Sequence, residues 1–323
     1  MFKKLLTNKR FLAGLSILIL LVVSSYMLDS YSKTHKIERI PEFSYKDNMP
    51  IRTAPAPPSL SHPLGVDAGG YDVLRTVLTH AKAPIISAFL ISLMRITISL
   101  IFAFFYAYFY RGVRWFNWLF ESFQYVPPTL LGILLLSHVQ YLLMDQKSEW
   151  FIYVITVLIL IGIPNLTQLI GNEIRLLLHN EFVTGSKVLG GGIFHIFKTH
   201  IRPYLLPKIF LWLNQQLLQV LVLIMHLSLF HMILIEIGGS IFLISSNFQL
   251  LILTPWVTYG PVLFFTLLVL VAYMMSSGVQ SVLQTENKLA EHSLLFSMIR
   301  KEQQEQCTKR KGLLKRKQVH IGK

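Results

Sequence analysis

Long apolar runs separated by short polar segments dominate the pattern of this chain. The runs cover residues 11–28, 84–109, 118–140, 150–170, 206–235 and 257–279. Each approaches or exceeds the roughly 20 residues that an α-helix needs to cross the hydrocarbon core of a bilayer. The pattern therefore predicts an all-α, polytopic membrane protein with about six transmembrane helices.

The longest polar interruption in the second half of the chain is EFVTGSKVLGGGIFHIFKTHIRP, residues 181–203. It predicts a helix over residues 181–189, a turn at the glycines 190–192, which tolerate positive φ, and a second helix. One side of the second helix carries apolar residues at helical spacing: Leu189, Ile193, Ile196 and Phe197. We expect Arg202-Pro203 to end this helix, because the residue before a proline is pushed out of the α region. The pattern fits a compact knob that a cytosolic partner grips, and equally a solvated loop that only connects two spans.

The longest loop, residues 29–83, combines a proline-rich stretch with a short amphipathic pattern. Prolines are frequent over residues 50–63, so we expect an extended conformation there. In the following HPLGVDAGGYDVLRTVL, Asp67 or Asp72 is placed to cap a short helix. That helix carries the apolar residues Val73, Leu74, Val77 and Leu78.

Polar residues inside the predicted spans are candidates for function, because a charge or an amide in hydrocarbon is costly. Arg95 lies inside the second apolar run. Gln215, Gln219 and His226 of the fifth run fall within about 40° of each other, counting 100° per residue, whereas Gln216 lies elsewhere around the helix. Two interpretations stay open: these residues line a translocation path, or they only join neighbouring helices.

Composition and charge agree with a membrane protein. The chain is 53% hydrophobic and 14% charged, which excludes an ordinary soluble domain. Of its 30 Lys and Arg residues, 21 lie in segments on the side of the termini, 8 on the opposite side, and Arg95 inside a span. The positive-inside rule therefore predicts that both termini are cytosolic. The apolar run after the basic residues 1–10 is long for a signal-peptide core and lacks a cleavage site, so we expect a retained first span.

The sequence predicts no chemistry of its own. No phosphate-binding loop with its Lys and Ser/Thr is present. The histidine pairs 195/200 and 226/231 lack the i, i+4 spacing of a helical zinc site. We predict no catalytic residue, no metal ion and no nucleic-acid partner, since nucleic acid requires a folded basic surface. The single cysteine, Cys307, excludes an intrachain disulfide.

Two segments resemble signatures of ABC-importer permeases. The first is similar to the family's "EAA" loop: Thr184, Gly185 and Ser186 stand at the Glu-Ala-Ala positions, Gly190 at the glycine, and Ile201-Arg202-Pro203 at Ile-Leu-Pro. The second, residues 62–74, is similar to the HPLGTDxxGRDVL signature of dipeptide, oligopeptide and nickel permeases, with Val66 and Tyr71 at the two departures. Between Pro164 and Ser228 the family pattern runs without a gap. The chain thus resembles a divergent inner-membrane permease of a binding-protein-dependent transport system.

The resemblance implies a type I importer-like permease that moves substrate, most simply peptides, by alternating access. It implies three partners: cytosolic ATPase subunits that bind the ATP, a second homologous permease and an extracellular substrate-binding protein. Membrane lipid is a fourth expected partner, because the basic tail can contact anionic headgroups. It also implies a multi-pass location in a prokaryotic plasma membrane. The residues that would couple to the ATPase are Thr184, Gly185, Ser186, Gly190, Ile201 and Pro203; those of a possible translocation path are Arg95, Gln215, Gln219 and His226.

The expected organisation has four parts. Residues 1–28 form the cytosolic N-terminus and first span, and residues 29–83 the extracytoplasmic loop. Residues 84–279 form the permease core, with a cytosolic coupling loop at 171–205, and residues 280–323 a basic cytosolic tail. Two alternatives remain: a permease-like subunit of an export, resistance or signalling system, and a membrane scaffold without a transport role.

Overall fold

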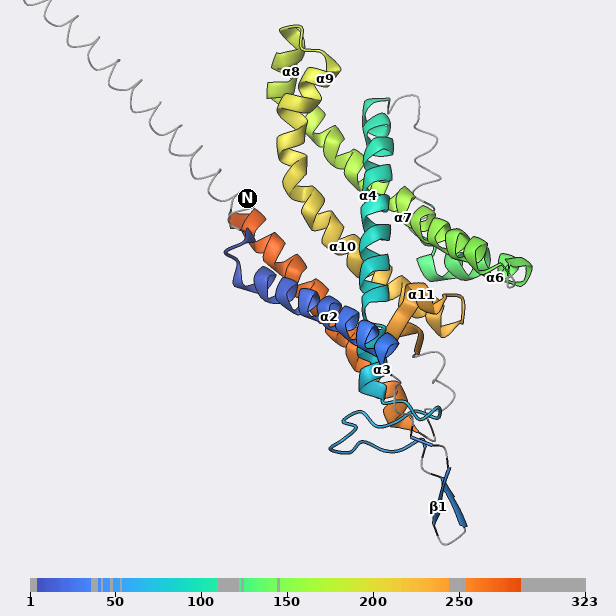
Figure 1. The fold of residues 1–323 in the computed structure, drawn as a ribbon. Coiled ribbons are helices and arrows are strands. Elements are labelled where there is room, and N and C mark those ends of the chain that lie inside the picture. Colours follow the sequence, from blue (N-terminus) through green and yellow to red (C-terminus); the bar gives the residue numbers. More distant parts are fainter. Residues whose placement is uncertain are drawn as a thin grey trace, which may run out of the picture.

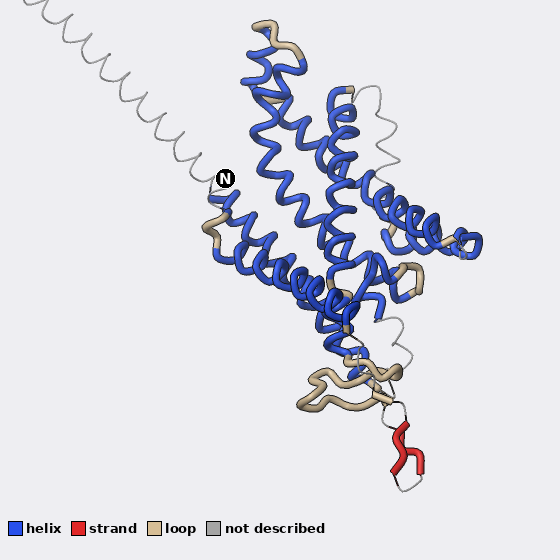
Figure 2. Tube along the Cα trace, in the orientation of Figure 1, coloured by secondary structure: helices blue, strands red, loops and turns tan. Residues whose placement is uncertain are grey.

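A computed structural model shows the chain as a bundle of long helices with a small looped region at one end (Figures 1 and 2). It describes residues 5–35, 40–41, 43–46, 49–52, 54–109, 122, 125–143, 146–243, 252 and 254–285. The predicted basic tail lies outside these residues except for its first six, and so does Cys307.

Among the described residues, five helices are long and apolar enough to cross a membrane. They are α2 (Lys9–Thr34); α3 (Val73–Thr79) with α4 (Lys82–Tyr108); α7 (Lys147–Leu178); α9 (Ile193–Ile196), η1 (Phe197–Ile201) and α10 (Arg202–Leu229) as one run; and the last helix, Pro255–Thr285. The shorter helices are α6 (Pro128–Leu143), α8 (Glu181–Val188), α11 (Ile235–Gly238) and η2 (Gly239–Ile241). The protein is therefore an α-helical, multi-pass membrane protein.

The third predicted span, residues 118–140, differs from the described helix. α6 begins at Pro128, where the missing proline N–H costs no helical hydrogen bond. It has 16 residues, or about 24 Å at 1.5 Å per residue, which is less than the roughly 30 Å of a bilayer core. Most of the predicted span before Pro128 lies outside the described residues.

α2 and the last helix run antiparallel, side by side (Figure 1). The amide of Asn8 donates to Ser281 Oγ at 2.9 Å. A Cβ at Gly14 would lie 2.8 Å from Met275 Cγ, so glycine lets the helices approach closely there. The start of α2 and the end of the last helix therefore lie at the same end of the bundle.

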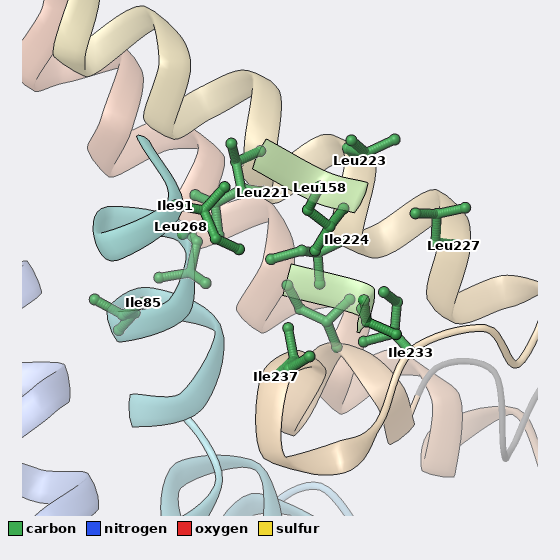
Figure 3. Packing of buried hydrophobic residues seen from close by; sticks show 14 of the residues in the cluster. Ile85, Ile91, Leu158, Leu221, Leu223, Ile224, Leu227, Ile233, Ile237 and Leu268 are labelled. Atoms are coloured by element: carbon green, nitrogen blue, oxygen red, sulfur yellow. The ribbon is translucent and has the colours of Figure 1, made fainter. Parts of the chain in front are cut away.

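The main core lies where α2, α3, α4, α6, α7, α10, α11 and the last helix meet, and Figure 3 shows part of it. It brings together Ile91 of α4, Leu158 of α7, Ile224 of α10, Ile237 of α11 and Leu268 of the last helix, all buried. Lipid tails are as apolar as these side chains, so close packing rather than expulsion of water stabilises the core. A second cluster, which includes Val183, Ile196 and Ile201, lies around α8, α9 and η1.

The end of the bundle away from the start of α2 carries a β-hairpin that the sequence pattern does not predict. β1 (Phe43–Lys46) pairs antiparallel with β2 (Met49–Arg52), and Tyr45 faces Pro50. The expected extended stretch therefore begins inside a strand. The all-α prediction holds for the bundle and is incomplete for this loop.

The predicted end of the second short helix at Arg202-Pro203 is wrong. The helical run passes from α9 through the π-helical turn η1 into α10 without a break. Pro203 lies at the second position of α10, where its missing N–H can be absorbed by the wider turn that precedes it. The backbone restriction of an Arg-Pro step was outweighed by the packing of Ile196, Ile201 and Leu205 in the second cluster.

Candidate functional site

The turn between α8 and α9 is built by a glycine in the left-handed region. Gly190 has φ +85°, and its N–H donates to Lys187 O at 3.0 Å. The N–H of Gly191 donates to Ser186 O at 2.8 Å. These two bonds form a Schellman motif, which satisfies the last carbonyl groups of α8 and reverses the chain. The predicted helix, glycine turn and helix are thus confirmed.

The two glycines of this motif are needed for different reasons. Nothing lies within 4 Å of a Cβ at Gly190, so only its φ opposes a side chain. A Cβ at Gly191 would lie 2.7 Å from Ser186 O, which is backbone and cannot give way. The turn is therefore fixed by conformation at one position and by contact at the next.

The base of the turn is held firmly to the bundle. Val183 and Ile201 are fully buried in the second cluster, together with Ile174 of α7. The ammonium of Lys208 on α10 pairs with the carboxylate of Glu173 on α7. α8 and α9 therefore move with the ends of α7 and α10 rather than as a loose loop.

The tip of the turn, by contrast, exposes apolar side chains. Val188, Leu189 and Phe194 are 83%, 89% and 79% exposed, respectively. Leu189 is the C-cap of α8 and precedes α9, so the prediction that it lies on one side of the second helix with Ile193 is wrong. We refer to Val188, Leu189 and Phe194 as the apolar tip. Large apolar side chains that are exposed together mark contact with a partner protein or with lipid.

The residues predicted for the turn separate into surface and core. Thr184, Gly185, Gly190 and Pro203 are exposed, and Ser186 is half-buried. Ile201, 1% exposed, belongs to the second cluster and anchors the turn from below. Five of the six residues are therefore accessible to a partner, and the sixth supports them.

A partly open cavity of about 590 Å³, which we call the central cavity, is lined by α4, α6, α7 and α10. Its polar wall residues are Arg95, Thr129, Asn165, Gln216, Gln219 and His226, and the rest of the wall is mainly Leu, Ile, Val and Pro. A volume of this size, mostly apolar with a few convergent polar groups, is typical of a small-molecule site.

Arg95 joins three helices at one side of this cavity. Its Nε donates to Leu158 O of α7 at 2.9 Å, and its Nη2 donates to the same carbonyl. Its Nη1 donates to Gln216 Oε1 of α10 at 3.1 Å. The amide of Gln216 in turn donates to Gln219 Oε1 at 2.9 Å. Arg95 thus joins neighbouring helices, as one interpretation of the sequence expects, and also lines the cavity, as expected for a residue of a translocation path.

Gly162 makes room for the Arg95 side chain. A Cβ at Gly162 would lie 2.6 Å from Arg95 Cδ and closer still to Nε. Gly162 follows Leu158 by one helical turn on α7, so it opens the surface beside the carbonyl that Arg95 reaches. A glycine in a helix interior is otherwise unfavourable by roughly 1 kcal/mol relative to alanine.

The predicted path residues only partly come together. Arg95, Gln219 and His226 line the cavity, whereas Gln215 is not part of its wall. His226 Nδ1 lies 3.0 Å from the hydroxyl of Thr129 on α6. The sequence analysis placed Gln216 elsewhere and did not select Thr129, Asn165 or Gly162. The cavity covers a wide angle around α10, because neighbouring helices form the rest of its wall. Counting residues along one helical face therefore does not identify all the wall residues.

The HPLGVDAGGYDVL segment folds as a compact cap outside the spans. Asp72 caps α3 by accepting the N–H of Arg75 at 2.8 Å, and its other oxygen lies 2.7 Å from His62 Nδ1. Asp67 accepts the N–H of Tyr71 at 2.8 Å, and burial raises the pKa of its carboxyl. Of the two predicted caps, Asp72 is therefore the one used. These contacts explain the motif by the local fold of the segment.

The local fold also requires glycine at positions 65 and 70 of the same segment. Both have positive φ, +76° and +79°. A Cβ at Gly65 would lie 2.6 Å from the Trp256 ring at the start of the last helix, and one at Gly70 would collide with Ile40 O. The segment is thus locked against the end of the bundle.

Among the described residues, no group of three or more His, Cys, Asp or Glu is arranged to hold a metal ion. No family model matches the chain, and no curated protein matches it. The geometry supports two kinds of event: docking of a partner at the apolar tip and binding of a small solute in the central cavity.

Proposed function

We propose that this chain is the transmembrane permease subunit of an ABC importer, and that separate ATPase subunits drive it through the turn between α8 and α9. The solute would cross by alternating access through the central cavity. A second permease subunit and an extracellular binding protein would complete the transporter, with peptides as the substrate class that the sequence resemblance favours.

The single observation that carries the proposal is the apolar tip on its rigid base. A loop that only connects two spans does not need to expose three large apolar side chains, Val188, Leu189 and Phe194. A docking element needs both an apolar contact surface and a stiff attachment, so that force on the tip reaches the spans. The second cluster and the pair between Lys208 and Glu173 supply the attachment.

The continuity of helix from the turn into the spans supports the same proposal. α9, η1 and α10 form one run, and α8 follows directly on α7. The same two long helices carry cavity residues, among them Asn165 on α7 and Gln219 on α10. A partner that moves the turn would thereby act on the cavity wall.

The experiment replaces Phe194 by aspartate in the full chain, expressed together with candidate ATPase subunits. We expect co-purification in mild detergent to fall at least about tenfold, because central apolar contact residues commonly contribute 2 kcal/mol or more. Leu60→Asp is the matched control, since Leu60 is fully exposed on the cap at the opposite end. Equal recovery of the ATPase with both variants would refute docking at the tip.

One observation favours a second candidate, a permease-like subunit of an export, resistance or signalling system. Thr184, which stands at the position of the family's glutamate, is exposed, and its hydroxyl donates only to Asn180 O at 3.4 Å. An ATPase that recognises the glutamate would find no carboxylate here. Co-purification of an ATPase without any extracellular binding protein would favour this candidate, and absence of both would favour a scaffold.

A further inference from the structure

The charge of Arg95 is buried, and no residue that the structure describes supplies a counter-ion. Its side chain is 2% exposed, and its bonds go to a backbone carbonyl and an amide, both neutral. No carboxylate of the described residues pairs with it. A buried guanidinium with only neutral acceptors is expensive, and an anion brought beside it recovers part of that cost.

The guanidinium also has capacity left for a ligand. It carries five N–H groups. Three of them donate to Leu158 O and Gln216 Oε1, which leaves two without an acceptor among the described residues. Arg95 forms part of the cavity wall. A planar fork of N–H donors matches the two oxygens of a carboxylate better than it matches a spherical ion.

A second residue of the cavity wall, Asn165, has a hydrogen-bond acceptor without a partner among the described residues. This acceptor, the Oδ1 atom, is buried, and Asn165 is one of the residues that line the cavity. An unpartnered buried acceptor costs free energy that a ligand N–H or O–H can recover. Within the described residues, the wall of one cavity therefore has a donor without an acceptor at Arg95 and an acceptor without a donor at Asn165.

We propose that the central cavity binds a small solute that carries both a carboxylate and an N–H donor, as amino acids and the ends of short peptides do. The carboxylate binds to Arg95, the N–H donates to Asn165, and the apolar wall contacts the side chain of the solute. This deepens the proposed function by naming the chemistry of the substrate. It rests on that function only in treating the bound solute as the one transported.

The test measures protection of a thiol placed on the wall. Val222, an apolar wall residue, is changed to cysteine in a Cys307→Ser chain, which otherwise holds no cysteine. The full chain in lipid nanodiscs is labelled with N-ethylmaleimide in the presence of N-acetyl-alanine. N-acetyl-alaninamide, which has the same size and no charge, is the matched probe, and sodium chloride tests for a plain anion site.

We expect N-acetyl-alanine to slow the labelling at a concentration at least about tenfold below that of the amide, since hydrogen bonds between charged groups exceed neutral ones by that order. Arg95→Gln should abolish this preference. Asn165→Leu, which keeps Arg95, should weaken protection by both probes and leave the preference intact. The first comparison uses unmodified Arg95, so it holds even where Arg95→Gln fails to fold.

Equal protection by the two probes, protection by chloride at the same concentration, or a thiol that the reagent never reaches would each overturn the proposal. The chain is tested without ATPase or partner permease, so the result is independent of docking at the tip. Binding without docking would leave a carboxylate site in a protein of another function. Docking without binding would leave an importer of other solutes.

Discussion

At the scale of single residues, Arg95 and Gly162 behave as one unit. Only glycine fits at position 162, because the Arg95 side chain occupies the space of a Cβ. The absence of a side chain there lets the guanidinium reach Leu158 O. An arginine inside an apolar run is readable from sequence, whereas the glycine that accommodates it lies on another helix, 67 positions later by residue number. The pair explains why an expensive cation is stable in this bundle.

Gly162→Ala is expected to lower the free energy of unfolding by about 1–3 kcal/mol, because a methyl group would overlap the Arg95 side chain. Thermal unfolding of the purified chain in detergent, followed by tryptophan fluorescence, measures the change. Gly185→Ala is the matched control: it is also a helical glycine, nothing lies within 4 Å of its Cβ, and alanine favours helix. Similar midpoints for the two variants would show that Arg95 does not occupy this space.

At the scale of elements, the turn between α8 and α9 depends on its helix ending at a defined residue. The Schellman bonds of Gly190 and Gly191 reverse the chain within a few residues, so that α9 can return along α7 and α4. Without that reversal, Ile196 and Ile201 could not reach the second cluster.

Gly190→Val should loosen this turn, because a β-branched residue at φ +85° costs roughly 1–2 kcal/mol. The amides of residues 190 and 191 should then exchange with deuterium about tenfold faster. Gly190→Asn is the control, since asparagine tolerates the left-handed region. Unchanged exchange in the valine variant would mean that the motif does not hold the turn.

The sequence predicted several elements correctly, and its errors have physical causes. The apolar runs located the long helices, and Gly190 located the turn, because both signals are local. Pro203 was misread because a π-helical turn before it accommodates the proline. The hairpin at Tyr45 and Pro50 was missed because proline is rare in strands. Asn165 and Gln216 were missed because only the packing of α6, α7 and α10 creates the cavity.

At the scale of the whole molecule, the two ends of the bundle are distinct. One end holds the start of α2, the end of the last helix and the projection of α8 and α9; the other holds the hairpin and the cap of residues 54–72 (Figure 1). Among the described residues, charges follow the same division only in part, since Lys82 and Lys33 at the cap end both pair with Asp29.

Cysteines at the two ends should label from opposite sides of the membrane. In a Cys307→Ser chain, Leu60→Cys marks the cap and Leu189→Cys marks the apolar tip, both at highly exposed positions. In sealed, right-side-out vesicles an impermeant maleimide should reach the Leu60 position, and the Leu189 position only after the membrane is permeabilised. Labelling of both positions in intact vesicles would contradict the arrangement.

The length of α7 has a further consequence. Thirty-two residues make a rod of about 48 Å, well beyond the roughly 30 Å of hydrocarbon that it crosses. Its far end is braced to α10 by Glu173 and Lys208, while its middle supplies Leu158, the carbonyl that Arg95 grips. Glu173 and Leu158 thus lie on the same helix, and Pro164, which has no backbone N–H, lies between them. A movement of the turn between α8 and α9 would tilt α7 or bend it at Pro164, and the bond from Arg95 to Leu158 O would carry that movement to α4.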